Sequence, residues 1–106
     1  MDDVFEKLYQ VVEERKLHPQ EGSYTCYLFE KGLDKILKKV GEEASETIIA
    51  AKNGVREDTV NEISDLLYHL VVMMADQNIR LEEIEAVLKE RSSKIGNLKT
   101  PHQSNP

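Results

Sequence analysis

Two pairs of carboxylates, each spaced three residues apart, are the side chains in this sequence best suited to chemistry. Glu43 and Glu46 form the first pair, and Glu62 and Asp65 form the second. On a helix, this spacing places both members on one face, about one turn apart. Both pairs border apolar positions, and carboxylates gathered there are costly to bury without a counter-charge.

A divalent cation with oxygen ligands would supply that counter-charge. Mg²⁺ fits this donor set, because it binds a few carboxylates together with waters and substrate phosphates. The single cysteine, Cys26, and the lack of paired histidines argue against zinc. No histidine follows a glutamate by three residues, which argues against a di-iron bundle. The residue types therefore predict a magnesium site, provided that the two pairs face each other across a helical hairpin.

The plain alternative is that the pairs lie on solvated helix faces, since either spacing alone is common in acidic helical proteins. Two pairs beside apolar residues on consecutive helices favour the metal site without excluding this alternative. Glu42 lies roughly opposite Val40 on its helix. Glu42 is therefore a weaker candidate for a metal ligand than the four paired carboxylates. It could act as a base, support the ligands, or simply be exposed.

Apolar residues recurring at intervals of three and four predict helices that position these acids. We expect a first helix around residues 5–12, a short one that Ser23 caps and Gly32 ends, one from Leu33 to Asn53, one from about Asp58 to Asn78, and a short amphipathic one around 81–88. No segment alternates long enough to be a strand. The expected fold class is all-α, a bundle of about four to five helices forming one domain over residues 1–98, with 99–106 as a flexible tail.

The segment from Asp58 to Asn78 is apolar over a broad arc, more than four short neighbours can cover. This predicts that a homodimer completes the bundle, with Val71 and Met74 as candidates for the interface.

Further residues are candidates for contacts with a phosphorylated ligand. Three of them, Ser23, Tyr24 and Thr25, stand at an expected helix start, where free backbone N–H groups favour anions; a plain cap with Tyr24 packed against it is the alternative. The basic candidates are Lys31, Lys35, Lys39 and Arg91. For Lys39 the alternative is pairing with Glu43 and Glu46, between which it falls in helical projection, and for the others it is a solvated side chain. His69, four residues after Asp65, either bonds that carboxylate or is a buried histidine with another partner.

Composition narrows the class of protein. The chain has 106 residues and a formal charge of −6, and the span from Glu42 to Asp65 holds seven carboxylates against two basic residues. This balance argues against a nucleic-acid or anionic-membrane surface, because both need a basic patch. No apolar run approaches the roughly 18 residues of a membrane span, and the start lacks the features of a signal peptide. We expect a cytoplasmic protein, consistent with the lone cysteine.

Two segments resemble the phosphoribosyl-ATP pyrophosphohydrolase family of histidine biosynthesis. They are Lys-Lys-Val-Gly-Glu-Glu-Ala-Ser-Glu, residues 38–46, and Glu-Ile-Ser-Asp-Leu-Leu-Tyr-His-Leu, residues 62–70. Ser23-Tyr24-Thr25 ahead of Gly-Leu-Asp-Lys-Ile, residues 32–36, is similar to that family too. The resemblance runs from about Phe5 to Arg91. It is more specific than the bare carboxylate pattern, which marks the wider all-α NTP pyrophosphatase superfamily of MazG-like proteins and dimeric dUTPases.

The resemblance implies an α-helical, usually dimeric, Mg²⁺-dependent enzyme without a covalent cofactor. It would hydrolyse the α–β phosphoanhydride of 1-(5-phospho-β-D-ribosyl)-ATP, giving the AMP form and pyrophosphate, in the second step of histidine biosynthesis. By the motif, the metal ligands are Glu43, Glu46, Glu62 and Asp65. One alternative is an enzyme with the same mechanism but another substrate, a house-cleaning (d)NTP pyrophosphatase of the MazG-like type. The other is a non-enzymatic helical module that associates through its apolar helix.

Overall fold

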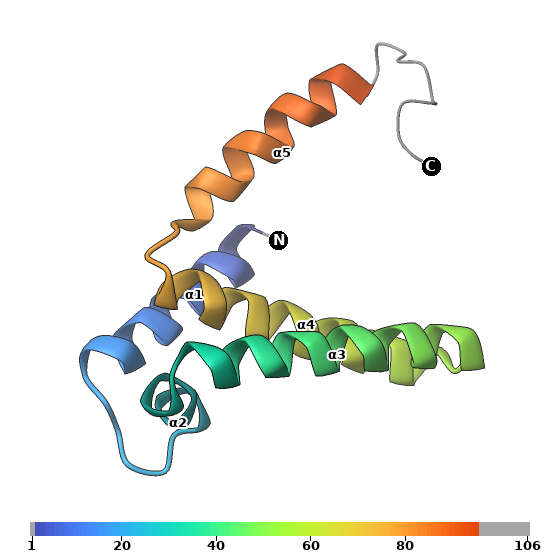
Figure 1. Ribbon diagram of the computed structural model, residues 1–106. Coiled ribbons are helices and arrows are strands. Elements are labelled where there is room, and N and C mark those ends of the chain that lie inside the picture. The colour runs from blue at the N-terminus through green and yellow to red at the C-terminus, as the bar shows by residue number, and fades with distance from the viewer. Residues whose placement is uncertain (1, 96–106) are drawn as a thin grey trace.

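A computed structural model describes residues 2–95 of the chain, and this part consists of five α-helices (Figure 1). In order they are α1 (Asp2–Leu17), α2 (Tyr24–Lys31), α3 (Leu33–Asn53), α4 (Arg56–Asp76) and α5 (Leu81–Ile95). No strand occurs between residues 2 and 95, so the expected all-α class is confirmed. The fourth helix begins two residues before the expected start at Asp58.

Local capping explains where the central helices begin and end. The Ser23 hydroxyl accepts a hydrogen bond from the backbone N–H of Cys26 at 3.1 Å and starts α2. Gly54 ends α3 in the left-handed conformation, with φ of 78°, and its N–H donates to the carbonyls of Ala50 and Ala51. Because only Gly54 and Val55 separate the helices, α4 runs back antiparallel beside α3 (Figure 1). This hairpin is what brings the two carboxylate pairs within reach of each other.

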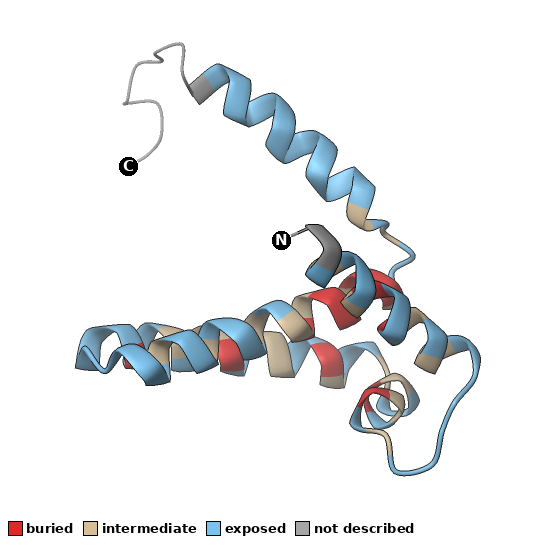
Figure 2. Cartoon of the chain, turned by 180° about the vertical axis from the view of Figure 1, so that it is seen from behind, coloured by how far each residue is buried: buried red, intermediate tan, exposed pale blue. Residues whose placement is uncertain are grey.

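The hydrophobic core lies at one end of the hairpin, where α1 and α2 pack against the start of α3 and the end of α4 (Figure 2). Its largest fully buried side chains are Val12, Leu28, Ile36 and Val72. A polar contact ties the same region together, since the Tyr9 hydroxyl donates to the carbonyl of Ile79 at 2.8 Å. The other end of the hairpin projects beyond this core.

The expectation that Val71 and Met74 form an interface between subunits was wrong. They are only 3% and 8% exposed, because α1 packs on this end of α4 and covers them within the chain. The large apolar side chains left exposed on the α3–α4 hairpin are others, namely Leu33, Leu37, Ile48, Ile49, Val55, Val60, Ile63 and Leu67. Helix α5 leads away from the other helices (Figure 1), and its Ile84, Val87 and Leu88 are exposed as well.

Two further expectations concern the C-terminal tail and the absence of a membrane-spanning segment. The proposed tail, residues 99–106, lies outside the described residues, as do the last residues of the proposed domain. None of the described helices combines the length and apolar character that crossing a membrane requires.

Truncation of a core leucine should test where the core lies. Leu28 is fully buried, so Leu28→Ala should lower the free energy of unfolding by about 2–5 kcal/mol. Leu17, 63% exposed at the end of α1, provides the matched control, and Leu17→Ala should cost less than about 0.5 kcal/mol. Urea unfolding followed by circular dichroism measures both, and equal losses would contradict this placement of the core.

Candidate metal centre

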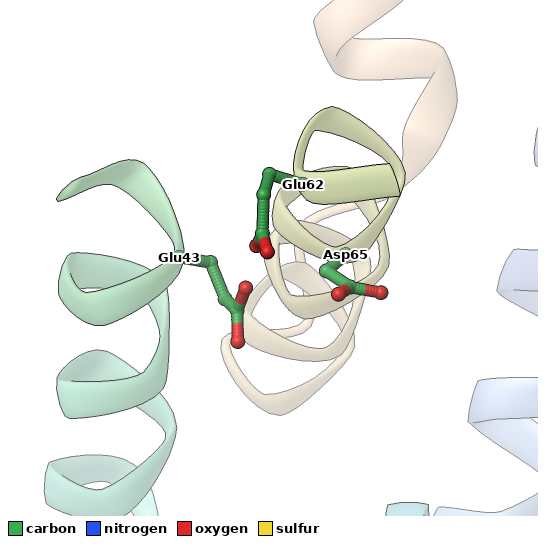
Figure 3. A group of neighbouring side chains, drawn as sticks. All are labelled: Glu43, Glu62 and Asp65. Atoms are coloured by element: carbon green, nitrogen blue, oxygen red, sulfur yellow. The ribbon is translucent and has the colours of Figure 1, made fainter. Parts of the chain in front are cut away.

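Three carboxylates from α3 and α4 lie close together, two of them in the space between the helices and the third, Asp65, exposed on α4. Glu43 comes from α3, and Glu62 and Asp65 come from α4 (Figure 3). One oxygen from each lies within 4.8 Å of the others. Glu43 and Glu62 point toward each other across the space between the helices (Figure 3). The structure therefore brings together three of the four acids that the motif marks as ligands.

One oxygen of Glu43 and one of Glu62 are buried without a hydrogen-bond partner, whereas Asp65 is exposed. Glu43 is only 7% exposed, which is rare for a glutamate. Glu43 Oε1 and Glu62 Oε1 are fully covered, and no hydrogen-bond donor among residues 2–95 reaches either. Burying unpaired charged oxygens is strongly unfavourable. A divalent cation would satisfy both oxygens at once, and the all-oxygen donor set suits Mg²⁺. The residues therefore fit the metal that the sequence predicts.

The cluster holds a proton more tightly than an ordinary carboxylate does. Burial, with the neighbouring carboxylates of Glu43 and Glu46, raises the pKa of Glu62 from 4.5 to about 7. Both causes disfavour a further negative charge at this point. Without a metal, the cluster therefore keeps part of its charge neutralised by a proton near neutral pH.

Glu46 and Glu42 lie beside the cluster and not inside it. Glu46 is exposed and does not belong to the group of three, but its effect on the pKa of Glu62 places it nearby. Glu42, also exposed, pairs with the Lys39 ammonium at 3.5 Å, and the same ammonium lies 3.7 Å from Glu43 Oε2. Lys39 is thus a cation at the edge of the cluster.

His69 supports the cluster through the backbone. Its Nδ1 lies 2.8 Å from the main-chain oxygen of Asp65, and its Nε2 lies 2.9 Å from the Tyr24 hydroxyl. A carbonyl oxygen only accepts, so Nδ1 carries the hydrogen, and Nε2 accepts from Tyr24. Sequence reasoning left open whether His69 bonds the Asp65 carboxylate or has another partner. The structure shows the other partners.

The structure places the remaining candidates for phosphate contacts at several separate positions outside the carboxylate cluster. Ser23 uses its hydroxyl in the cap of α2, and the buried Thr25 hydroxyl bonds that of Tyr68, so neither presents a hydroxyl without a partner. Lys31 and Lys35 lie over the ring of Tyr27, a residue that sequence reasoning missed and that its position three residues after Tyr24 could have flagged. Arg91 is exposed on α5, which leads away from the hairpin, so a single chain does not bring it to the cluster (Figure 1).

A cleft of about 830 Å³ lies apart from the carboxylates. It is formed by the end of α1, the connector after it and α2, and Arg15, Gln20 and Tyr24 are among the residues that line it. No member of the carboxylate cluster lines this cleft. Its shape alone therefore does not mark the site of chemistry.

Comparison with known proteins gives consistent results. Residues 5–92 match the family model described as phosphoribosyl-ATP pyrophosphohydrolase. The phosphoribosyl-ATP pyrophosphatase of Clostridium acetobutylicum is 56% identical over 98 residues, covering 92% of this chain and 89% of that protein. That of Streptococcus gordonii is 56% identical over 91 residues, covering 86% and 88%. The histidine biosynthesis bifunctional protein HisIE of Caldanaerobacter subterraneus is 53% identical over 92 residues, covering 87% of this chain and 45% of that protein.

The raised pKa of Glu62 predicts how stability depends on pH without metal. Between pH 4.5 and about 7, folded Glu62 keeps a proton that the unfolded chain releases. This residue therefore makes the free energy of unfolding fall as pH rises through that window and level off above it. Urea unfolding in EDTA at a series of pH values should show this fall, and Glu62→Gln should remove it. Glu85→Gln, which changes an exposed glutamate on α5, should keep it. A Glu62→Gln profile parallel to that of the unmodified chain would contradict the assignment.

Proposed function

The chain belongs to the phosphoribosyl-ATP pyrophosphohydrolase family, and we propose that its carboxylate cluster is the Mg²⁺ site at which it acts. The reaction is hydrolysis of 1-(5-phospho-β-D-ribosyl)-ATP to the corresponding AMP and pyrophosphate, in histidine biosynthesis. The observation that carries the assignment of the site is the pair of buried, unpartnered oxygens, Glu43 Oε1 and Glu62 Oε1. A bound cation explains why the fold tolerates them.

The cluster supplies three of the proposed ligands, Glu43, Glu62 and Asp65. We add Glu46 as the fourth, because its carboxylate already lies close enough to raise the pKa of Glu62. Its side chain is exposed, so it can turn toward an ion without disturbing the packing of the helices. When bound, Mg²⁺ would reverse the sign of the site, bind phosphate oxygens and stabilise the leaving pyrophosphate.

Two residues beside the ligands are suited to act on the reacting groups. Hydrolysis adds one water across the α–β anhydride, so one proton must leave that water. We propose Glu42 as the base, because it lies at the edge of the cluster, is open to solvent and is held by Lys39 at 3.5 Å. Lys39 also lies near Glu43, where its ammonium can contact a phosphate oxygen. Burial alone would lower the pKa of Lys39, but the groups around it, including Glu42 and Glu43, raise it. Lys39 therefore stays charged.

We also propose that the working unit is a homodimer. The hairpin that carries the cluster extends beyond the core and exposes large apolar side chains, with Ile48 at 65% and Ile49 at 59%. A second copy that covers this surface would shield both the apolar side chains and the carboxylates from water. The cytoplasm is the expected setting, because a pathway of amino-acid biosynthesis supplies the substrate and Cys26 is unpaired.

Removal of one carboxylate should separate a metal-dependent enzyme from a non-enzymatic helical module. Glu43→Gln should lower kcat on phosphoribosyl-ATP at least a hundredfold and abolish the rise in Tm that Mg²⁺ gives the unmodified chain. Without metal, the variant should be slightly more stable, because it relieves repulsion. Glu57→Gln, at an exposed position in the first turn of α4, should change neither property.

A substrate panel completes this test. Faster pyrophosphate release from a plain (d)NTP than from phosphoribosyl-ATP would favour the house-cleaning function. A Tm that does not respond to Mg²⁺, together with no pyrophosphate release from any nucleotide, would leave only a non-enzymatic helical module.

Light scattering should give the mass of two chains for the unmodified protein. Ile49→Glu places a charge in the proposed interface and should shift the mass toward that of one chain. Val4→Glu, which makes the same change at a 69% exposed position on α1, should leave the dimer intact. A mass of one chain for the unmodified protein would exclude the dimer.

A further inference from the structure

Two lysines gather at the junction of α2 and α3 without a counter-charge. The ammonium of Lys31, in the last turn of α2, lies 5.7 Å from the centre of the Tyr27 ring. That of Lys35, in the first turns of α3, lies 5.9 Å from the same centre. Within residues 2–95, no carboxylate oxygen lies within 4 Å of either ammonium, whereas Lys39 has two such neighbours.

This arrangement suits a phosphate monoester. Two cations that share one ring repel each other, and an anion between them would turn that repulsion into attraction. A phosphate monoester carries about −1.5 to −2 charge at pH 7 and offers three acceptor oxygens, enough for both ammonium groups. The edge of α2 and α3 therefore presents a basic corner, defined by Lys31, Lys35 and Tyr27.

One residue of the basic corner, Lys35, and one of the carboxylate cluster, Glu43, lie on the same face of α3. Lys35, Lys39 and Glu43 follow each other at intervals of four, so they share a face of α3. Two helical turns, about 12 Å of rise, separate Lys35 from Glu43.

Tyr24 links the two places through its side chain. Its ring stacks on Tyr27 at 6.1 Å, and its hydroxyl donates to His69, which in turn holds the backbone of Asp65. The corner is therefore built on the same framework that positions the metal ligands.

The substrate has a second phosphate for such a corner to bind. Phosphoribosyl-ATP differs from ATP by a ribose 5-phosphate attached to N1 of the adenine. Two ribose rings and the purine separate this phosphate from the triphosphate. A molecule held by its triphosphate at the carboxylate cluster thus carries its other phosphate away from the cluster, so a separate basic site is needed to bind it.

We propose that Lys31 and Lys35 bind the 5-phosphate of the phosphoribosyl group and thereby distinguish this substrate from ATP. This proposal rests on the proposed function and names the residues that determine the substrate specificity of the enzyme. The carboxylate cluster with its metal serves the triphosphate, which both nucleotides possess. The basic corner binds the 5-phosphate, which phosphoribosyl-ATP carries and ATP lacks.

Charge removal tests this proposal. In the double variant Lys31→Gln, Lys35→Gln, the KM for phosphoribosyl-ATP should rise roughly tenfold or more, with kcat changed little. The inhibition constant of ATP, used as a competitor so that slow turnover does not matter, should stay within about twofold. Lys31→Arg, Lys35→Arg keeps both charges and should restore most of the affinity. Lys52→Gln, near the other end of α3, should behave like the unmodified chain.

Three results would overturn the proposal. One is an unchanged KM for phosphoribosyl-ATP in the double glutamine variant. Another is an equal loss of affinity for both nucleotides, which would place the lysines at the triphosphate. The third is a selective loss in Arg15→Gln instead, which would place the second phosphate in the cleft beside α1. By contrast, an unmodified chain that does not prefer phosphoribosyl-ATP to ATP would show that the proposed function fails, before any variant is compared.

Discussion

Repulsion between carboxylates buried across the α3–α4 hairpin is the constraint on which the rest of the structure depends. Glu43 is 7% exposed and faces Glu62, and each has an oxygen that no donor in the described chain reaches. Such an arrangement lowers stability unless a proton or a cation neutralises it. The pKa of Glu62, raised to about 7 by burial and its acidic neighbours, shows the proton in that role. The proposed metal would replace it.

The residues that stabilise the fold and the residues proposed to bind the metal lie in different parts of the α3–α4 hairpin. At one end, α1 and α2 cover α3 and α4 with a hydrophobic core that includes Leu28 and Val72. Beyond that core, the buried Glu43 and the half-buried Glu62 place carboxylates in the space between the two helices. Several large apolar side chains there, Ile48 and Ile49 among them, remain exposed in one chain. The proposed second subunit would cover these side chains in the half of the molecule that carries the carboxylates.

Helical periodicity predicted the elements well, because caps and faces are local properties. Ser23 and Gly54 mark helix ends by their own chemistry, and a spacing of three fixes a shared face. Which helix packs against a given face depends on residues distant in the sequence, and this explains the predictions that failed. The broad apolar arc of α4 included Val71, but only the fold shows that α1 covers it. Likewise, no spacing reveals that the hydroxyl of Tyr24, 45 residues earlier in the chain, bonds His69.

The most direct test of this account is the proton released when Mg²⁺ binds. Calorimetric titration in two buffers with different ionisation enthalpies measures that number. Because Glu62 has a pKa of about 7 without metal, binding should release about half a proton per chain at pH 7 and almost none at pH 9. Binding that releases no proton at pH 7, or no binding of Mg²⁺ at all, would contradict the claim that the cation relieves this repulsion.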